Sequence, residues 1–77
     1  MPTIAHVKGY RLYFVSFDGS EPIHVHLRKG NRAAKVWLAP LRVAWSDFGR
    51  HENREIVQIV QANAGLIKDS WHEHFGV

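Results

Sequence analysis

The sequence predicts an α+β domain, in which an antiparallel meander of three to four strands is followed by one long or two short C-terminal helices packed on one sheet face. Two observations predict this fold. Residues 1–42 consist of short β-prone runs separated by turn residues, whereas from residue 51 onward apolar side chains recur every three or four positions, the period of an α-helix. We therefore expect a single domain over residues 1–77, with a sheet part over 1–42 and a helical part over 43–77.

The first two strands are expected before residue 18. Residues 3–7 form a short β-prone run, which we place at a sheet edge. Residues 9–17 are rich in aromatic and β-branched side chains and are apolar on both faces, so this strand should lie centrally or be covered on both sides. Residues 18–20, Asp-Gly-Ser, form the turn that follows.

The strongest signal is a β-hairpin, formed by residues 21–28 and 32–38 around a turn at residues 29–31. Successive side chains of a strand point to opposite faces of the sheet. One face of the hairpin is therefore aliphatic and should pack on the core. The opposite face carries two imidazoles, a guanidinium, an ammonium group and an indole, from His24, His26, Arg28, Lys35 and Trp37.

The aliphatic face should also fix the register of the hairpin. A slip of one residue would turn the basic side chains into the core, so the register that keeps them outside is strongly preferred. The cross-strand pairs expected from it are Val25 with Val36, His26 with Lys35, and His24 with Trp37.

Residues 41–46 are interpreted as an apolar link between sheet and helix, with Trp45 used for packing. Either Ser46-Asp47 or Gly49 should precede the helical part. Its apolar side chains lie four, four, three, four and four residues apart and form one stripe, made of Ile56, Val60, Ala64, Ile67, Trp71 and Phe75.

Two residues decide whether this helical part is continuous. Asn63 and Gly65 are poor helix-interior residues, so the helix is expected either to run through them or to break in two there. Gly76 is a natural terminator.

Charge and composition narrow the function classes. The chain has no cysteine, which excludes a disulfide or thiolate zinc site and is consistent with the cytoplasm, and neither a membrane span nor a signal peptide is expected. Residues 1–42 carry seven Lys or Arg against two acids, whereas residues 43–77 carry three against five. A basic sheet part favours polyanions such as nucleic acid. A chain of this size is also expected to form a homo-oligomer or a complex with a partner.

Three chemistries fit the polar face of the hairpin. His24 and His26 can act as general acid and base on RNA, because imidazole titrates near neutral pH. The face can instead simply bind RNA, with Trp37 stacking on a base and Arg28, Lys35 and Arg32 contacting phosphates. The two imidazoles can also bind a transition metal, for which Glu21 or His6 would be the further ligand. A solvated sheet face without function is the competing interpretation, and no metal or other cofactor is included in our prediction.

Several sequence blocks resemble a bacterial family, namely Gly9-Tyr-Arg, Glu21-Pro-Ile-His-Val-His, Ala34-Lys-Val-Trp-Leu and Trp71-His-Glu-His-Phe-Gly, with Met1-Pro-Thr-Ile in front. The chain is similar to domain-of-unknown-function family 4160 over nearly its whole length. It departs from the family pattern at Ile23, where a second proline is usual, and at His72, where an asparagine is usual.

This resemblance implies a component of a bacterial toxin–antitoxin pair, commonly encoded beside a second small protein and usually labelled the toxin. It implies His24, His26 and Trp37 as the functional set, with Glu21 beside them. The leading prediction is a toxin-like protein with a cognate antitoxin-like partner, acting on RNA as a metal-independent endoribonuclease. The alternative is a non-enzymatic binding module, such as an antitoxin-like, regulatory or phage-type inhibitor protein.

Overall fold

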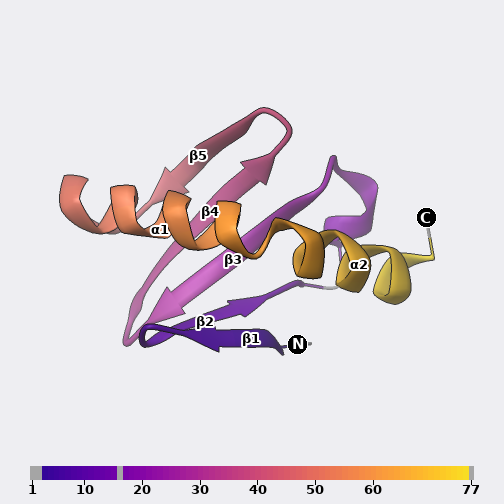
Figure 1. Ribbon diagram of the computed structural model, residues 1–77, viewed down its shortest axis with the longest axis horizontal. Coiled ribbons are helices and arrows are strands. Elements are labelled where there is room, and N and C mark those ends of the chain that lie inside the picture. Colours follow the sequence, from indigo (N-terminus) through magenta and orange to yellow (C-terminus); the bar gives the residue numbers. More distant parts are fainter. Residues whose placement is uncertain (1–2, 16, 77) are drawn as a thin grey trace.

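The computed structural model describes residues 3–15 and 17–76, and it has two layers (Figure 1). One layer is a five-stranded antiparallel sheet in which the strands lie in sequence order. The other consists of two consecutive helices that run across one face of this sheet. The elements are β1 (Thr3–Val7), β2 (Tyr10–Tyr13), a single 3-10 turn η1 (Asp18–Ser20), β3 (His24–Lys29), β4 (Arg32–Leu38), β5 (Leu41–Ser46), α1 (Arg50–Ala62) and α2 (Ala64–Phe75).

The predicted class and the placement of the helices are confirmed, and the hairpin register is as expected. Strand β1 lies at the sheet edge, and β3 and β4 are joined by a two-residue turn in which Gly30 has a positive φ of 64°. Such a backbone conformation costs glycine little, because it has no Cβ. The observed pairs include Val25 with Val36, His26 with Lys35, and His24 with Trp37.

The sheet has one strand more than predicted, because Leu41–Ser46 is strand β5 and not a link. Its pairing with β4 contains an irregularity: Trp45 lies opposite Lys35, but Val43 lies opposite Val36. Ala44 is therefore an extra residue on β5. Beyond this bulge the side chains change faces, so Trp45 does not share a face with Val43 although the two are two residues apart.

Strand β2 is shorter than the predicted run of residues 9–17. It ends at Tyr13, and Phe17 is 87% exposed instead of packing on the sheet; Ser16 lies outside the described residues. A local turn takes the chain away from the sheet, because the backbone N–H of Asp18 donates to the carbonyl of Val15 (3.1 Å) and that of Val15 donates to Asp18 Oδ2 (2.7 Å). The side chain of an aspartate thus competes with sheet pairing.

The helical part breaks in two at Asn63, the first of the two weak positions, and α1 begins after Gly49. The predicted stripe faces the sheet, with Ile56, Val60, Ile67 and Trp71 buried and with Ala64 and Phe75 half-buried. Together with the aliphatic side chains of β2, β3 and β4, the stripe forms one core. Its other main members are Tyr10, Leu12, Phe14, Val25, Leu27, Ala34, Val36, Phe48 and Ile59.

Candidate functional site

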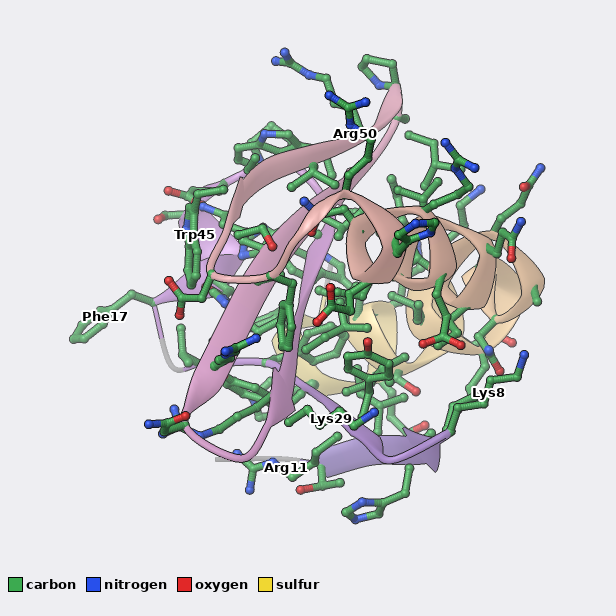
Figure 2. All side chains as sticks on the ribbon, turned by 90° about the vertical axis from the view of Figure 1, so that its left-hand side faces the viewer. Lys8, Arg11, Phe17, Lys29, Trp45 and Arg50 are labelled. Carbon is green, nitrogen blue, oxygen red and sulfur yellow. The ribbon has the colours of Figure 1, made fainter. Side chains whose placement is uncertain are left out.

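The sheet face opposite the helices carries cationic and aromatic side chains from four neighbouring strands. Figure 2 shows Trp45 and Phe17 on this side of the sheet, with the helices on the other side. The cross-strand pairs place the other residues, because side chains directly opposite each other share a face. We call the resulting surface the open face; it consists of Arg11, Tyr13, Arg28, Lys35, Trp37, Arg42 and Trp45.

Lys35 lies at the centre of the open face and is already engaged. Its Nζ lies 4.4 Å from the centre of the Trp37 ring and donates to Glu21 Oε1 at 2.6 Å. The hydrogen bond and charge of Lys35 outweigh the desolvation of Glu21 and lower the pKa of that carboxyl group. Glu21 therefore positions Lys35 beside the indole, and it neutralises part of the positive charge of the face.

A second group of cations lies toward the β2–β3 side. Arg11, Tyr13, Arg28 and Gly30 line a shallow hollow, and the Arg11 guanidinium lies over the Tyr13 ring at 4.6 Å from its centre. Arg28 Nε donates to the carbonyl of Gly30 at 3.2 Å. Two guanidinium groups side by side can bind a phosphate, whereas the Tyr13 ring is only 6% exposed and is covered by Arg11 and His26.

Of the residues predicted to bind nucleic acid, the structure brings Arg28, Lys35 and Trp37 together but separates Arg32 from them. Arg32 lies on the helix-covered face, where its Nη1 is 3.7 Å from Glu52 Oε2 of α1. Trp45 is also placed differently from the prediction: it is 47% exposed on the open face and does not pack inside the domain. The bulge in β5 explains this placement, because it turns Trp45 to the same side as Lys35.

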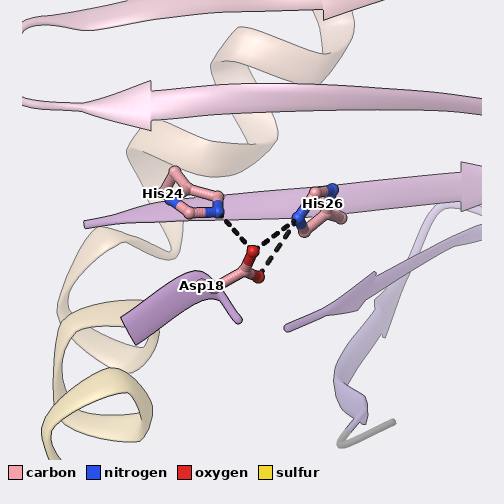
Figure 3. Close-up of side chains that lie close together, drawn as sticks. All are labelled: Asp18, His24 and His26. Atoms are coloured by element: carbon pink, nitrogen blue, oxygen red, sulfur yellow. Dashed lines mark hydrogen bonds and ion pairs between the residues drawn. The ribbon is translucent and has the colours of Figure 1, made fainter. Parts of the chain in front are cut away.

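The two predicted catalytic histidines are close together but buried. His24 is fully buried and His26 is 9% exposed. Figure 3 shows both rings beside the carboxylate of Asp18, which comes from η1. His24 Nε2 lies 2.9 Å from Asp18 Oδ1, and His26 Nε2 lies 3.2 Å and 3.1 Å from Oδ1 and Oδ2. We call these three residues the His–Asp cluster.

Aromatic side chains explain why His24 is fully buried on the sheet face that also carries the exposed Arg28. Its ring is 5.2 Å from the ring of Trp37 and 5.3 Å from that of Trp71. Trp71 belongs to α2 and also packs edge-on against Phe14. The first residue of β3 is thus enclosed by a helix, a neighbouring strand and the turn η1. The ring of His26 stacks on Tyr13 at 5.3 Å and is less enclosed.

The cluster contains an ionised carboxylate beside imidazoles. Burial acts to raise the pKa of Asp18, but the hydrogen bond from the Val15 N–H and the two neighbouring imidazoles outweigh it, so the pKa is lowered. Burial lowers the pKa of His26 and outweighs the opposing effect of Asp18. This favours the neutral form of His26, which is the form that donates one hydrogen bond and keeps a lone pair.

A family model, described as Domain of unknown function (DUF4160), matches residues 9–72. The chain belongs to this family. No curated protein and no solved structure gives a significant match. The matched region of this DUF4160 chain includes the His–Asp cluster and the whole open face. Among the described residues, no helix is both long and apolar enough to cross a membrane.

Sequence reasoning on this DUF4160 domain missed Asp18, which was interpreted only as a turn residue. Glu21 and His6 were the expected companions of the histidines. Glu21 Oε1 is 3.8 Å from His24 Nδ1 and is held by Lys35, whereas His6 lies on β1, opposite Arg11. The available signal was the short spacing between the turn and β3, which allows an aspartate in the turn to fold back onto the strand.

Proposed function

We propose that this protein is a toxin-like component of a bacterial toxin–antitoxin pair that acts in the cytoplasm by binding single-stranded RNA on its open face. The observation that carries the proposal is the gathering of cations with the partly exposed rings of Trp37 and Trp45 on the sheet face opposite α1 and α2. Lys and Arg neutralise phosphates, while aromatic rings stack on unpaired bases with little dependence on sequence. The cationic side chains alternate with the rings, as Arg11 does with Tyr13 and Lys35 with Trp37.

The geometry supports binding better than metal-independent cleavage. A general acid and base must reach the reacting phosphodiester directly or through one water. His24 has no exposed surface, and its two ring nitrogens face Pro22 and Asp18. Binding of RNA through the cations and rings around the cluster requires no such access.

We further propose that the antitoxin-like partner neutralises the protein by covering the open face or by adding a strand to the sheet. Strands β1 and β5 are the two edges of the sheet, and an edge strand can pair with another chain through its free backbone groups. A partner on the open face would compete with RNA, whereas a partner at an edge would leave RNA binding intact.

The exposed aromatic side chains favour a second candidate function, a protein-binding module. Phe17 is 87% exposed and Trp45 is 47% exposed, on the same side of the sheet. Large aromatic side chains are the commonest anchors of protein–protein interfaces. Such a module would bind its partner with little dependence on salt, in contrast to an RNA-binding protein.

Anisotropy of a fluorescent single-stranded RNA of about a dozen nucleotides, measured at several salt concentrations, tests the RNA proposal. Arg28→Ala should weaken binding and lower the slope of log K against log salt by about 0.7, because one phosphate contact is lost. Trp45→Ala should cost about 1–3 kcal/mol of binding free energy and leave the slope unchanged.

Arg54→Ala is the matched control for Arg28→Ala, because Arg54 is an exposed arginine of α1, on the other side of the sheet. Its affinity and salt slope should equal those of the wild type. If the wild type does not bind RNA, or if Arg54→Ala weakens binding as much as Arg28→Ala, the open face is not an RNA-binding surface.

Growth after induced expression in bacteria tests the toxin-like role separately. The wild type should arrest growth, and a folded Arg28→Ala/Trp45→Ala double variant should not. Circular dichroism of both purified proteins checks that the variant is folded. If the wild type leaves growth unchanged while it binds RNA, the protein is a binding module and the toxin-like role is wrong.

A further inference from the structure

The His–Asp cluster has the ligand set and the spacing of a metal site. One ligand atom from each of Asp18, His24 and His26 lies within 4.8 Å of the other two. Around a tetrahedral ion with metal–ligand distances of about 2.0–2.1 Å, ligand atoms lie about 3.3–3.4 Å apart. The Nε2 atoms of His24 and His26 lie 2.9 Å and 3.2 Å from the same carboxylate oxygen, Asp18 Oδ1. An opening of a few tenths of an ångström would therefore accommodate the ion.

The orientation of His24 is that of a metal ligand. Its Nδ1 lies 2.9 Å from the carbonyl oxygen of Pro22, which can only accept, so Nδ1 carries a hydrogen and donates it. In the neutral ring, Nε2 then has a lone pair that points into the cluster. Histidines that bind metals almost always donate their other ring N–H to a carbonyl or carboxylate in this way.

The same Nε2 lacks a hydrogen-bond partner of its own. It is completely buried and, among the described residues, makes no hydrogen bond, although Asp18 Oδ1 is only 2.9 Å away. A neutral imidazole lone pair and a carboxylate oxygen are both acceptors and repel each other at this distance. A cation between them would remove this conflict.

The carboxylate is supported in the way that metal-binding carboxylates usually are. The backbone N–H of Val15 donates to Asp18 Oδ2 at 2.7 Å, which fixes the side chain against the turn. Hydrogen bonds to the ligating carboxylate orient it and keep it ionised. His24 and Asp18 are thus each held in place by a hydrogen bond with a backbone group.

We propose that Asp18, His24 and His26 bind one divalent transition-metal ion of the zinc type. Two imidazoles and one carboxylate suit zinc and its neighbours, whereas magnesium and calcium prefer oxygen ligands only. The ion would fasten η1 to β3 and leave a fourth coordination position for water. A small domain without cysteine gains most from such a fastening. This inference goes beyond the proposed function and does not depend on RNA binding.

The competing occupant of the cluster is a proton. In that case the proton is retained between His24 Nε2 and Asp18 when metal is added, and the three residues remain a hydrogen-bonded cluster that binds no metal. The two occupants predict opposite results when metal is added to the chelator-treated wild-type protein, so no variant is needed to distinguish them.

The first experiment is a titration of the wild-type protein with Zn²⁺, followed by NMR of the histidine ring nitrogens. One equivalent should shift the ring signals of His24 and His26 and leave those of the other four histidines unchanged. Co²⁺ should give the visible absorption of a bound, low-coordinate ion, and Mg²⁺ should change neither signal. If no ring signal moves, if the other histidines move instead, or if Mg²⁺ acts as Zn²⁺ does, the proposal is wrong.

The second experiment compares two variants in which an aspartate is replaced by its neutral isostere. Asp18→Asn should lower the affinity for Zn²⁺ at least tenfold to a hundredfold, the range seen when only a supporting residue of a site is lost. Asp69→Asn, at an exposed position of α2, should bind as the wild type does. Equal affinities in the two folded variants would overturn the proposal; if Asp18→Asn does not fold, the wild-type titration decides.

Discussion

The two faces of strand β3 differ in what covers them, although their residues alternate along one chain. Val25 and Leu27 are fully buried against the helices, whereas Arg28 is exposed on the open face. By its register His24 lies on the same side of the sheet as the open face, yet it is as buried as Val25. The alternation of side chains along a strand decides which face of the sheet each one occupies. The neighbouring elements decide whether that part of the face is covered.

The largest expected effect comes from two adjacent residues of β3. Leu27→Ala removes a fully buried side chain from the core, so the free energy of unfolding should fall by about 2–5 kcal/mol. Arg28→Ala changes an exposed side chain and should alter this free energy by less than about 0.5 kcal/mol. Urea unfolding followed by circular dichroism measures both. Similar losses in the two variants would mean that the open face is covered in solution.

His24 is expected to give the next largest effect, because it lies on the same side of the sheet as the open face but is buried like a core residue. In the presence of a chelator, His24→Ala should lower the free energy of unfolding by about 1–3 kcal/mol, since it removes a fully buried ring that packs against Trp37 and Trp71. His6→Ala is the matched control; it replaces an exposed histidine of β1 and should stay within about 0.5 kcal/mol of the wild type. Equal unfolding midpoints for the two variants would show that His24 is not part of the packed structure.

The parts of the molecule that follow local rules were predictable from the sequence. The register of the β3–β4 hairpin is fixed by the aliphatic face of Val25, Leu27 and Val36, and one stripe of side chains fixes how the helices face the sheet. The break at Asn63 follows from its poor fit to a helix interior. Each of these features depends on periodicity or on a single residue, both of which a sequence displays directly.

The parts that depend on contacts between distant or irregular segments were missed. Strand β5 was interpreted as a link, and the bulge at Ala44 places Trp45 on the open face, which its spacing from Val43 does not predict. The burial of His24 depends on Trp71, which is 47 residues away in the chain. Asp18 joins the histidines because a local turn folds it back onto β3, and turn residues give no periodic signal. The sequence therefore predicted the two histidines of the candidate site, but it predicted neither the Asp18 carboxylate beside them nor the Trp71 ring that covers His24.

The smallest expected effect is a gain in stability in α2, one of the two helices that cover the core. It comes from a substitution that changes no side-chain contact. Gly65 lies near the start of α2, and no atom lies within 4 Å of the Cβ that Gly65→Ala would add. The substitution restricts the unfolded chain and should raise the free energy of unfolding by about 0.5 kcal/mol. Gly30→Ala provides the opposite control: its surroundings are equally empty, but its φ of +64° disfavours any side chain, so stability should fall by about 1 kcal/mol. Opposite shifts of the urea midpoint would show that backbone conformation, and not space, separates the two positions. A loss of stability in Gly65→Ala would mean that this part of α2 does not hold a regular helix.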